Sequence, residues 1–201
     1  MHKVFISHHH ANDQAYKNDL LALNSQYPIF IDASVDTGDI SDDLSDSVIR
    51  EKIRDEYLRD SKVTLVLVGA ETKRRKHVDW EIYSSMFDGQ VNKKSGVVVI
   101  NLPTAYSAYY DAAHTGEKET VYPETTDWTT IDKRSEYEQR YPRMPERIID
   151  NLLKPGAKVS VTPWSKIERN AVVLQFLIDA AYNDRQSCEY DLSRPMRRSN
   201  S

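Results

Sequence analysis

The most constraining feature of this chain is an apolar run at 62–69, Lys-Val-Thr-Leu-Val-Leu-Val-Gly. A strand that is apolar along nearly its whole length is typical of a parallel sheet covered by helices on both sides, because neither of its faces meets water. A second run of this kind, Gly-Val-Val-Val-Ile-Asn-Leu, occupies 96–102. The two runs predict a sheet that is buried between two layers of helices.

Amphipathic segments separate these runs from one another and from three shorter apolar runs. Strands are predicted at 3–7, 28–32, 62–69, 96–102 and 157–161. Helices are predicted where apolar residues recur at spacings of three and four, at about 14–25, 41–57, 77–88, 144–153 and 170–183. Regular alternation of strand and helix favours parallel βαβ units. We therefore expect an α/β flavodoxin-like fold whose five-stranded parallel sheet has the order 2-1-3-4-5, with helices on both faces.

The alternation stops at Pro103, and 103–156 holds many polar residues and tyrosines without a clear strand. A structureless loop of that length is uncommon inside a compact domain. We interpret 1–185 as one domain in which 103–156 is an insertion. The insertion is expected to have short elements of its own and to form a tyrosine-rich wall near the ligand site, which is predicted below from the strand order. The tail at 186–201 is predicted to be disordered.

Charge and composition argue against several classes of partner. The net charge is −4, so no general basic field attracts nucleic acid or an anionic membrane. One basic cluster, 73–76, is interpreted as a solvated loop, with a local phosphate contact as the alternative. The single cysteine, Cys188, cannot form an internal disulfide, and no apolar run approaches the ~20 residues of a membrane span. We expect a cytoplasmic protein with no nucleic-acid and no membrane partner.

The predicted strand order places a site. Open parallel sheets bind ligands beyond the carboxyl ends of their strands, where the order reverses. Here that point lies between the first and third strands. Ser7 and His8 follow the first strand, 69–76 follows the third, and Asp32 with the 33–40 loop approaches from the second.

Glu81 is the most suggestive side chain near this point. It belongs to the helix after the third strand, next to Ile82 and one turn from Val78. That position predicts a carboxylate at the rim of the buried stripe, facing the cleft. The alternative is an ordinary exposed helix glutamate.

Two segments carry a resemblance to a known family. Residues 3–8, Lys-Val-Phe-Ile-Ser-His, resemble the opening strand of TIR domains. Residues 74–82, Arg-Arg-Lys-His-Val-Asp-Trp-Glu-Ile, resemble their third helix, in which a tryptophan or cysteine lies near an acidic residue. Over about 1–102 the chain is similar to the TIR-like group that includes ThsB of the bacterial Thoeris antiphage system. It departs from many TIR domains at 32–39, which lacks their Arg-Asp-x-x-Pro-Gly loop, and in the insertion.

The resemblance implies an enzyme that cleaves NAD at the nicotinamide–ribose bond. Its product would be an ADP-ribose-derived signal, cyclic in many members, that activates a partner effector protein. By resemblance Glu81 is the catalytic carboxylate, and the substrate-binding residues are Phe5, Ser7, His8, Asp32 and Trp80. NAD is then the substrate, with no cofactor and no metal. A phage-derived trigger and self-association are further expectations.

Three other interpretations compete with this one. The main alternative is a non-catalytic TIR module that acts as a scaffold. A receiver domain shares the fold but needs an acidic pair after the first strand, where this chain has Ser-His-His at 7–9. A metal site at His8, His9 and His10 lacks a spaced partner such as Cys-x-x-Cys or His-Glu-x-x-His.

Overall fold

The protein is described from a computed structural model, which covers residues 1–34, 43–90 and 92–200. A parallel five-stranded sheet forms its centre, in the order β2-β1-β3-β4-β5. The strands are β1 (His2–Ser7), β2 (Phe30–Asp32), β3 (Val63–Val68), β4 (Gly96–Asn101) and β5 (Ser160–Pro163). The predicted α/β flavodoxin-like fold and its strand order are confirmed.

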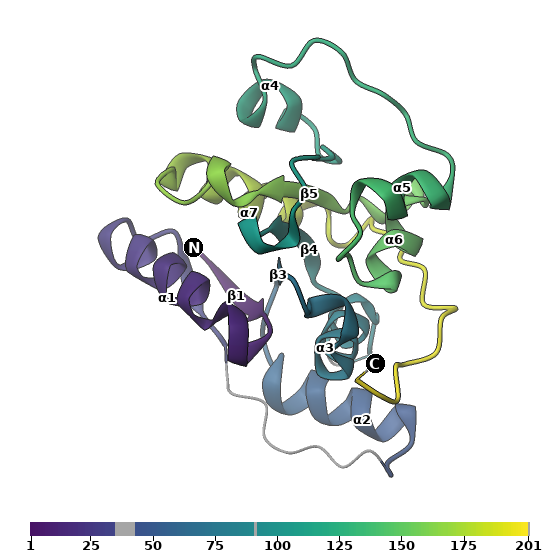
Figure 1. The fold of residues 1–201 in the computed structure, drawn as a ribbon. Helices are drawn as coiled ribbons and strands as arrows, with labels where there is room; N and C mark the ends of the chain where they lie inside the picture. The colour runs from purple at the N-terminus through teal and green to yellow at the C-terminus, as the bar shows by residue number, and fades with distance from the viewer. Residues whose placement is uncertain (35–42, 91, 201) are drawn as a thin grey trace.

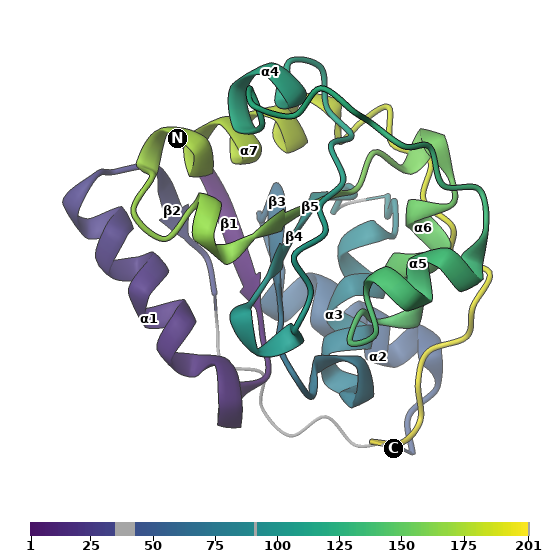
Figure 2. The same ribbon diagram turned by 45° about the horizontal axis from the view of Figure 1, so that its top comes forward.

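Helices cover both faces of the sheet (Figures 1 and 2). One face packs against α1 (His10–Gln26) and α7 (Ala171–Asp184), and the other against α2 (Asp46–Lys52), α3 (Lys76–Met86) and α6 (Glu146–Leu152). Side chains of β3 alternate between the two layers: Leu65 and Leu67 join the α1 and α7 side, whereas Val66 and Val68 join the α3 side. All four are fully buried, which explains why the strand is apolar throughout.

Several element boundaries depart from the prediction. The first helix begins at His10, earlier than expected, and Asp13 is buried in its first turn. The start predicted for the second helix lies outside the described residues; α2 begins at Asp46, where the Ser45 hydroxyl accepts a bond from the Val48 amide, and a π-helical turn, Ile53–Tyr57, follows it. Strand β5 begins later than 157 because Pro155–Ala157 form a 3-10 turn.

The insertion has short elements of its own, as predicted: a 3-10 turn (Pro103–Ala105), α4 (Glu117–Val121), α5 (Arg134–Arg140) and α6. Asp111 forms an antiparallel bridge with Val161 of β5, and buried Tyr122 stacks on Tyr110 with ring centroids 4.1 Å apart. The aromatic wall therefore covers the outer edge of β5. The expectation that it lies near Ser7 and Glu81 is wrong, because β3 and β4 separate β5 from β1. An uncovered edge strand exposes unpaired backbone groups, which this packing satisfies.

The C-terminal segment is ordered where the structure describes it, at 186–200, and the expectation of a disordered tail is wrong there. It runs past α6 and α3 to the amino-terminal end of α2 (Figure 1). Cys188 is 1% exposed and Met196 is 3% exposed. The polar composition of the segment concealed this packing, because its backbone groups find partners on helices far away in sequence.

Candidate active site

Ser7 and Glu81 form a buried pair at the carboxyl end of β1. The Ser7 hydroxyl donates to Glu81 Oε2 at 2.6 Å. Ser7 is fully buried and Glu81 is 3% exposed. The structure thus joins the end of β1 to α3, as the switch-point argument predicted.

Glu81 is more deeply buried than the rim position expected from its helix pattern. Sequence periodicity assumes that a helix has one covered face, but α3 is covered by the sheet, by α2, by α6 and by the C-terminal segment. Neighbouring residues of α3, including Asp79, Trp80 and Ile82, are therefore also buried. The alternative of an exposed surface glutamate is likewise wrong.

Burial governs the ionisation of this carboxyl group. Desolvation raises the pKa of Glu81 to about 7, while the Ser7 hydrogen bond and the charge of Lys17 act in the opposite direction. A carboxyl group with this pKa changes charge near neutrality. Such a shifted group at a strand switch point is typical of a functional site.

His8 lies directly after Ser7 and is 3% exposed. Its Nε2 contacts the Gln14 side chain at 3.0 Å, and its ring stacks on His10 with centroids 4.4 Å apart. Burial lowers the pKa of His8, which favours the neutral ring. Among the described residues, no group of three or more His, Cys, Asp or Glu side chains is placed to hold a metal ion.

A second buried carboxylate, Asp13, lies at the same edge of the sheet. Its Oδ2 accepts a bond from Thr72 Oγ1 at 3.3 Å, and Thr72 in turn accepts from the Gly69 amide at 2.8 Å. A Cβ atom at Gly69 would collide with the Asp13 carboxylate, so glycine permits this close approach. Burial raises the pKa of Asp13.

Sequence reasoning missed Asp13 and Lys17 as parts of this region. Both are buried, and with Leu20 they fall at spacings of four and three on the inner face of α1. Two charged residues on the apolar face of a helix are the signal that could have found them. The charge of Lys17 acts on both Glu81 and His8.

Phe5 and Trp80 do not line an open cleft in this structure, which corrects that expectation. Phe5 is 2% exposed and Trp80 is fully buried, in one apolar cluster with Ile49, Ile53 and Met196. The Trp80 indole N–H donates to the Arg197 carbonyl at 2.7 Å. Both aromatic rings therefore belong to the buried apolar cluster that joins β1, α2 and α3.

The other sequence-predicted residues lie at the periphery. Asp32 is exposed at the end of β2, where its carboxylate accepts from the Ser34 amide at 2.9 Å. The loop expected to approach from there is described only to residue 34. In the basic cluster, Lys73 pairs with Glu146 at 2.9 Å, and Arg75 lies 3.7 Å from Glu71.

Comparison with known protein families identifies the family of this chain. A family model described as Thoeris protein ThsB, TIR-like domain, matches residues 5–107. The chain belongs to this family. Comparison with curated proteins and with solved structures gave no match. Within the described residues of this ThsB-family chain, every helix is too short or too polar to cross a membrane.

The matched segment of the TIR-like domain contains the whole Ser7–Glu81 arrangement, from β1 through α3 to β4. A single desolvated carboxylate at a strand switch point can stabilise positive charge that develops on a bound ligand. The described part of the TIR-like domain offers Glu81 for that task at this edge, with Lys17 as a nearby buried cation.

Proposed function

We propose that this TIR-like domain cleaves NAD at the nicotinamide–ribose bond in antiphage defence. The observation that carries the proposal is the buried Ser7–Glu81 pair, with its 2.6 Å hydrogen bond, at the carboxyl end of β1. The ADP-ribose-derived product would activate a partner effector protein. In this proposal the domain works in the cytoplasm, responds to a phage-derived trigger and self-associates.

The reaction needs one carboxylate and no general acid, because the leaving group does not have to be protonated. The bond between ribose C1′ and the nicotinamide nitrogen breaks, and its electron pair leaves with the nitrogen, so the pyridinium becomes neutral nicotinamide. The ribose then has oxocarbenium character, as in glycoside cleavage. Ionised Glu81 offsets this charge. Water that adds to C1′ and loses a proton gives linear ADP-ribose, whereas a base nitrogen of the same molecule gives a ring.

The remaining predicted residues divide into two roles. Ser7 and Asp32 end β1 and β2, His8 directly follows Ser7, and these three residues are proposed to bind the nucleotide. Phe5 and Trp80 are buried in one apolar cluster and are proposed to act on the substrate only by holding β1 and α3, and hence Ser7 and Glu81, in position. NAD is the substrate, and the proposal includes no cofactor and no metal.

A non-catalytic interaction module is the second candidate function. The observation that favours it is the 3% exposure of Glu81, since a carboxylate bonded to Ser7 could simply tie α3 to β1. In that case replacement of Glu81 would change stability and self-association but would leave the levels of NAD and its cleavage products unchanged.

Glu81→Gln separates the two candidates, because it keeps the size of the side chain and removes its charge. We expect nicotinamide release to fall roughly a hundredfold, which corresponds to a loss of ~3 kcal/mol of transition-state stabilisation. The measurement is nicotinamide release from NAD in cells that carry the intact defence system, during infection.

Two control variants accompany this measurement. Glu117→Gln changes a fully buried glutamate near β5, whose pKa burial also raises to about 7. Glu71→Gln changes a half-buried glutamate in the loop before α3. Both should keep full activity. Full activity of Glu81→Gln would exclude this residue as the catalytic carboxylate and leave the interaction module as the better interpretation.

A further inference from the structure

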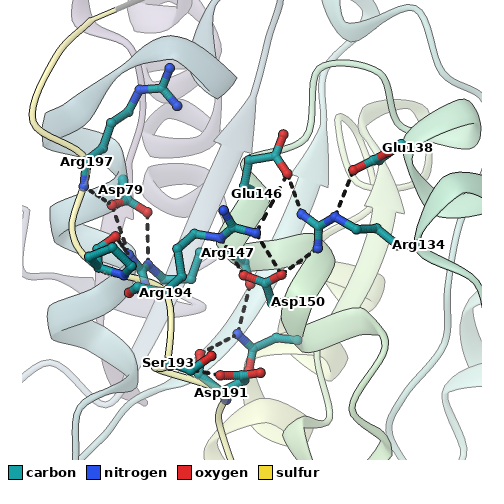
Figure 3. Close-up of polar contacts among 12 residues, drawn as sticks. Asp79, Arg134, Glu138, Glu146, Arg147, Asp150, Asp191, Ser193, Arg194 and Arg197 are labelled. Carbon is teal, nitrogen blue, oxygen red and sulfur yellow. Dashed lines mark hydrogen bonds and ion pairs between the residues drawn. The ribbon is translucent and has the colours of Figure 1, made fainter.

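The C-terminal residues 194–200, here called the strap, cross α3 and end beside α2 (Figure 1). The beginning of the strap is held by bonds from a buried arginine, Arg147, which lies near Asp79 and Arg194 in Figure 3. Arg147 of α6 is fully buried and donates to both carboxylate oxygens of Asp79, at 2.9 and 3.0 Å. It also donates to the carbonyls of Arg194 at 2.9 Å and Pro195 at 3.1 Å. This end of the strap is therefore firmly attached to α3 and α6.

The middle of the strap covers the apolar cluster that contains Phe5 and Trp80. Met196 is 3% exposed and lies in the apolar cluster with Phe5 and Trp80. The next residue, Arg197, donates its amide to Asp79 Oδ2 at 2.9 Å and accepts from the Trp80 indole at 2.7 Å. Trp80 precedes Glu81 on α3 and Phe5 lies two residues before Ser7 on β1, so the strap rests on close chain neighbours of both residues of the proposed site.

The far end of the strap joins α3 to α2 through exposed contacts. Arg198 donates to the Leu44 carbonyl at 2.8 Å and pairs with Asp46, and the two charged side chains are 49% and 41% exposed. The Asn200 side chain accepts from the Lys76 amide at 2.9 Å. Exposed ion pairs contribute little and are screened by salt, so this end is held much more weakly than the beginning.

The described arrangement is closed toward a nucleotide. With Ser7 fully buried and Glu81 at 3% exposure, a ribose cannot contact the carboxylate until neighbouring elements move. The strap bonds to α3 at Lys76 and to α2 at Asp46, the amino-terminal residues of these helices. Detaching its far end would remove these bonds between α2 and α3 and leave the sheet, the shared apolar cluster and the Arg147 bonds in place.

We propose that the strap is a latch, which holds α2 against α3 in the closed arrangement and, when its far end detaches, opens the path of the nucleotide to Ser7 and Glu81. This inference rests on the proposed function, because that proposal identifies NAD as the molecule that enters when the latch opens. A strap that merely supports the fold would behave in the opposite way, because loosening it would lower activity.

The test uses the full chain with Arg198→Ala, which removes the exposed contacts to α2. Arg169→Ala, at an exposed arginine on the loop before α7, is the matched control. Two quantities are measured: hydrogen exchange of the Trp80 indole N–H by NMR, and NAD binding and cleavage. Losing an exposed pair changes an equilibrium by up to about fivefold, so we expect both quantities to rise by up to about that factor. Met196→Ala, which removes the apolar anchor, should raise them by more than about tenfold.

A cross-link provides the reverse test. Asp46→Cys with Arg198→Cys breaks the ion pair, so before cross-linking this double variant should resemble Arg198→Ala. A short bis-maleimide that joins the two thiols should then slow Trp80 exchange and reduce NAD binding and cleavage below the wild-type level. Cys188 is 1% exposed and is poorly placed to react.

The readouts separate failure of the latch from failure of the proposed reaction. If indole exchange and NAD binding rise together in Arg198→Ala but no variant cleaves NAD, the latch stands and the proposed reaction falls. If indole exchange is unchanged, or rises while NAD binding and cleavage stay level or fall, the latch is overturned. Equal effects of Arg169→Ala would also overturn it.

Discussion

Glu81 acquires its properties from the number of elements that surround α3. A glutamate on a helix with one covered face would be hydrated, but this one bonds to Ser7 and is 3% exposed. Desolvation outweighs both the Ser7 hydrogen bond and the charge of Lys17, and the pKa rises to about 7. The same site therefore holds either a neutral or an ionised carboxyl group, depending on small changes in pH or hydration.

This ionisation predicts a pH dependence of stability. The pKa of Glu81 is about 7 in the folded chain against 4.5 for an ordinary glutamate, so the folded state binds more protons between these values. Stability from this group is complete below about pH 4.5 and is lost as pH rises through 7. Relative to wild type, Glu81→Gln should gain about 3 kcal/mol in free energy of unfolding above pH 7.

Urea unfolding at pH 5, 7 and 8.5 measures this difference. Below pH 5 the two proteins should converge, because the neutral carboxyl group and the amide are then alike in charge. Glu71→Gln, in the loop before α3, should show no such trend. A constant difference between wild type and Glu81→Gln across the series would mean that Glu81 has an ordinary pKa.

At the scale of elements, close approach of backbones fixes how α7 sits on the sheet. Gly96 begins β4, and a Cβ atom there would collide with the backbone carbonyl of Ala181 in α7. Glycine is required at this position because the obstacle is backbone and cannot rotate away. The amino end of β4 thereby lies directly against the last turns of α7.

Gly96→Ala tests this contact. Forcing a methyl group into a packed helix–strand interface costs typically 1–3 kcal/mol, and urea unfolding should show that loss of stability. The control is Gly156→Ala, whose Cβ would meet Cβ and Oε2 of Glu189 at 3.3 Å, much farther than the Cβ of Gly96→Ala would be from the Ala181 carbonyl oxygen, and which should cost less. Equal stability of the two variants would show that α7 can shift to accept the methyl group.

At the scale of the whole molecule, the insertion closes one edge of the sheet and the strap closes the α2–α3 face. Val161 of β5 exchanges backbone hydrogen bonds with Asp111, at 3.0 and 2.9 Å. The Tyr122 hydroxyl donates to the Val161 carbonyl at 3.3 Å while its ring stacks on Tyr110. The insertion thus takes the place of a further strand and prevents the β5 edge from pairing with another chain.

Tyr122→Ala should expose this edge. Removal of a fully buried aromatic side chain costs typically 3–5 kcal/mol, and the freed edge should promote aggregation. Light scattering during thermal unfolding is the measurement, with Tyr106→Ala, at an 81% exposed tyrosine of the same insertion, as the control. A monomeric and stable Tyr122→Ala would show that the Asp111 bridge alone protects the edge.

The sequence by itself determined the parallel sheet and the helix that carries Glu81, and the strand order predicted from it is the observed one. Continuous apolar runs such as 62–69 can be satisfied only between two helical layers, and alternating elements restrict the connections to parallel crossovers. The pairing of the Ser7 region with Glu81 followed from the same topology, since strand order fixes which loops meet. These features depend on local patterns and on chain connectivity.

Only the tertiary structure decided how deeply Glu81 is buried, where the insertion packs and where the tail lies. Each of these depends on partners remote in sequence: α3 is enclosed by α6 and the strap, Tyr122 meets β5, and Met196 meets Phe5 and Trp80. Periodicity reports the covered face of an isolated helix and carries no information about a second or third neighbour. A polar segment such as 194–200 is indistinguishable from a disordered tail until Arg147 and Asp79 provide bonds for its backbone.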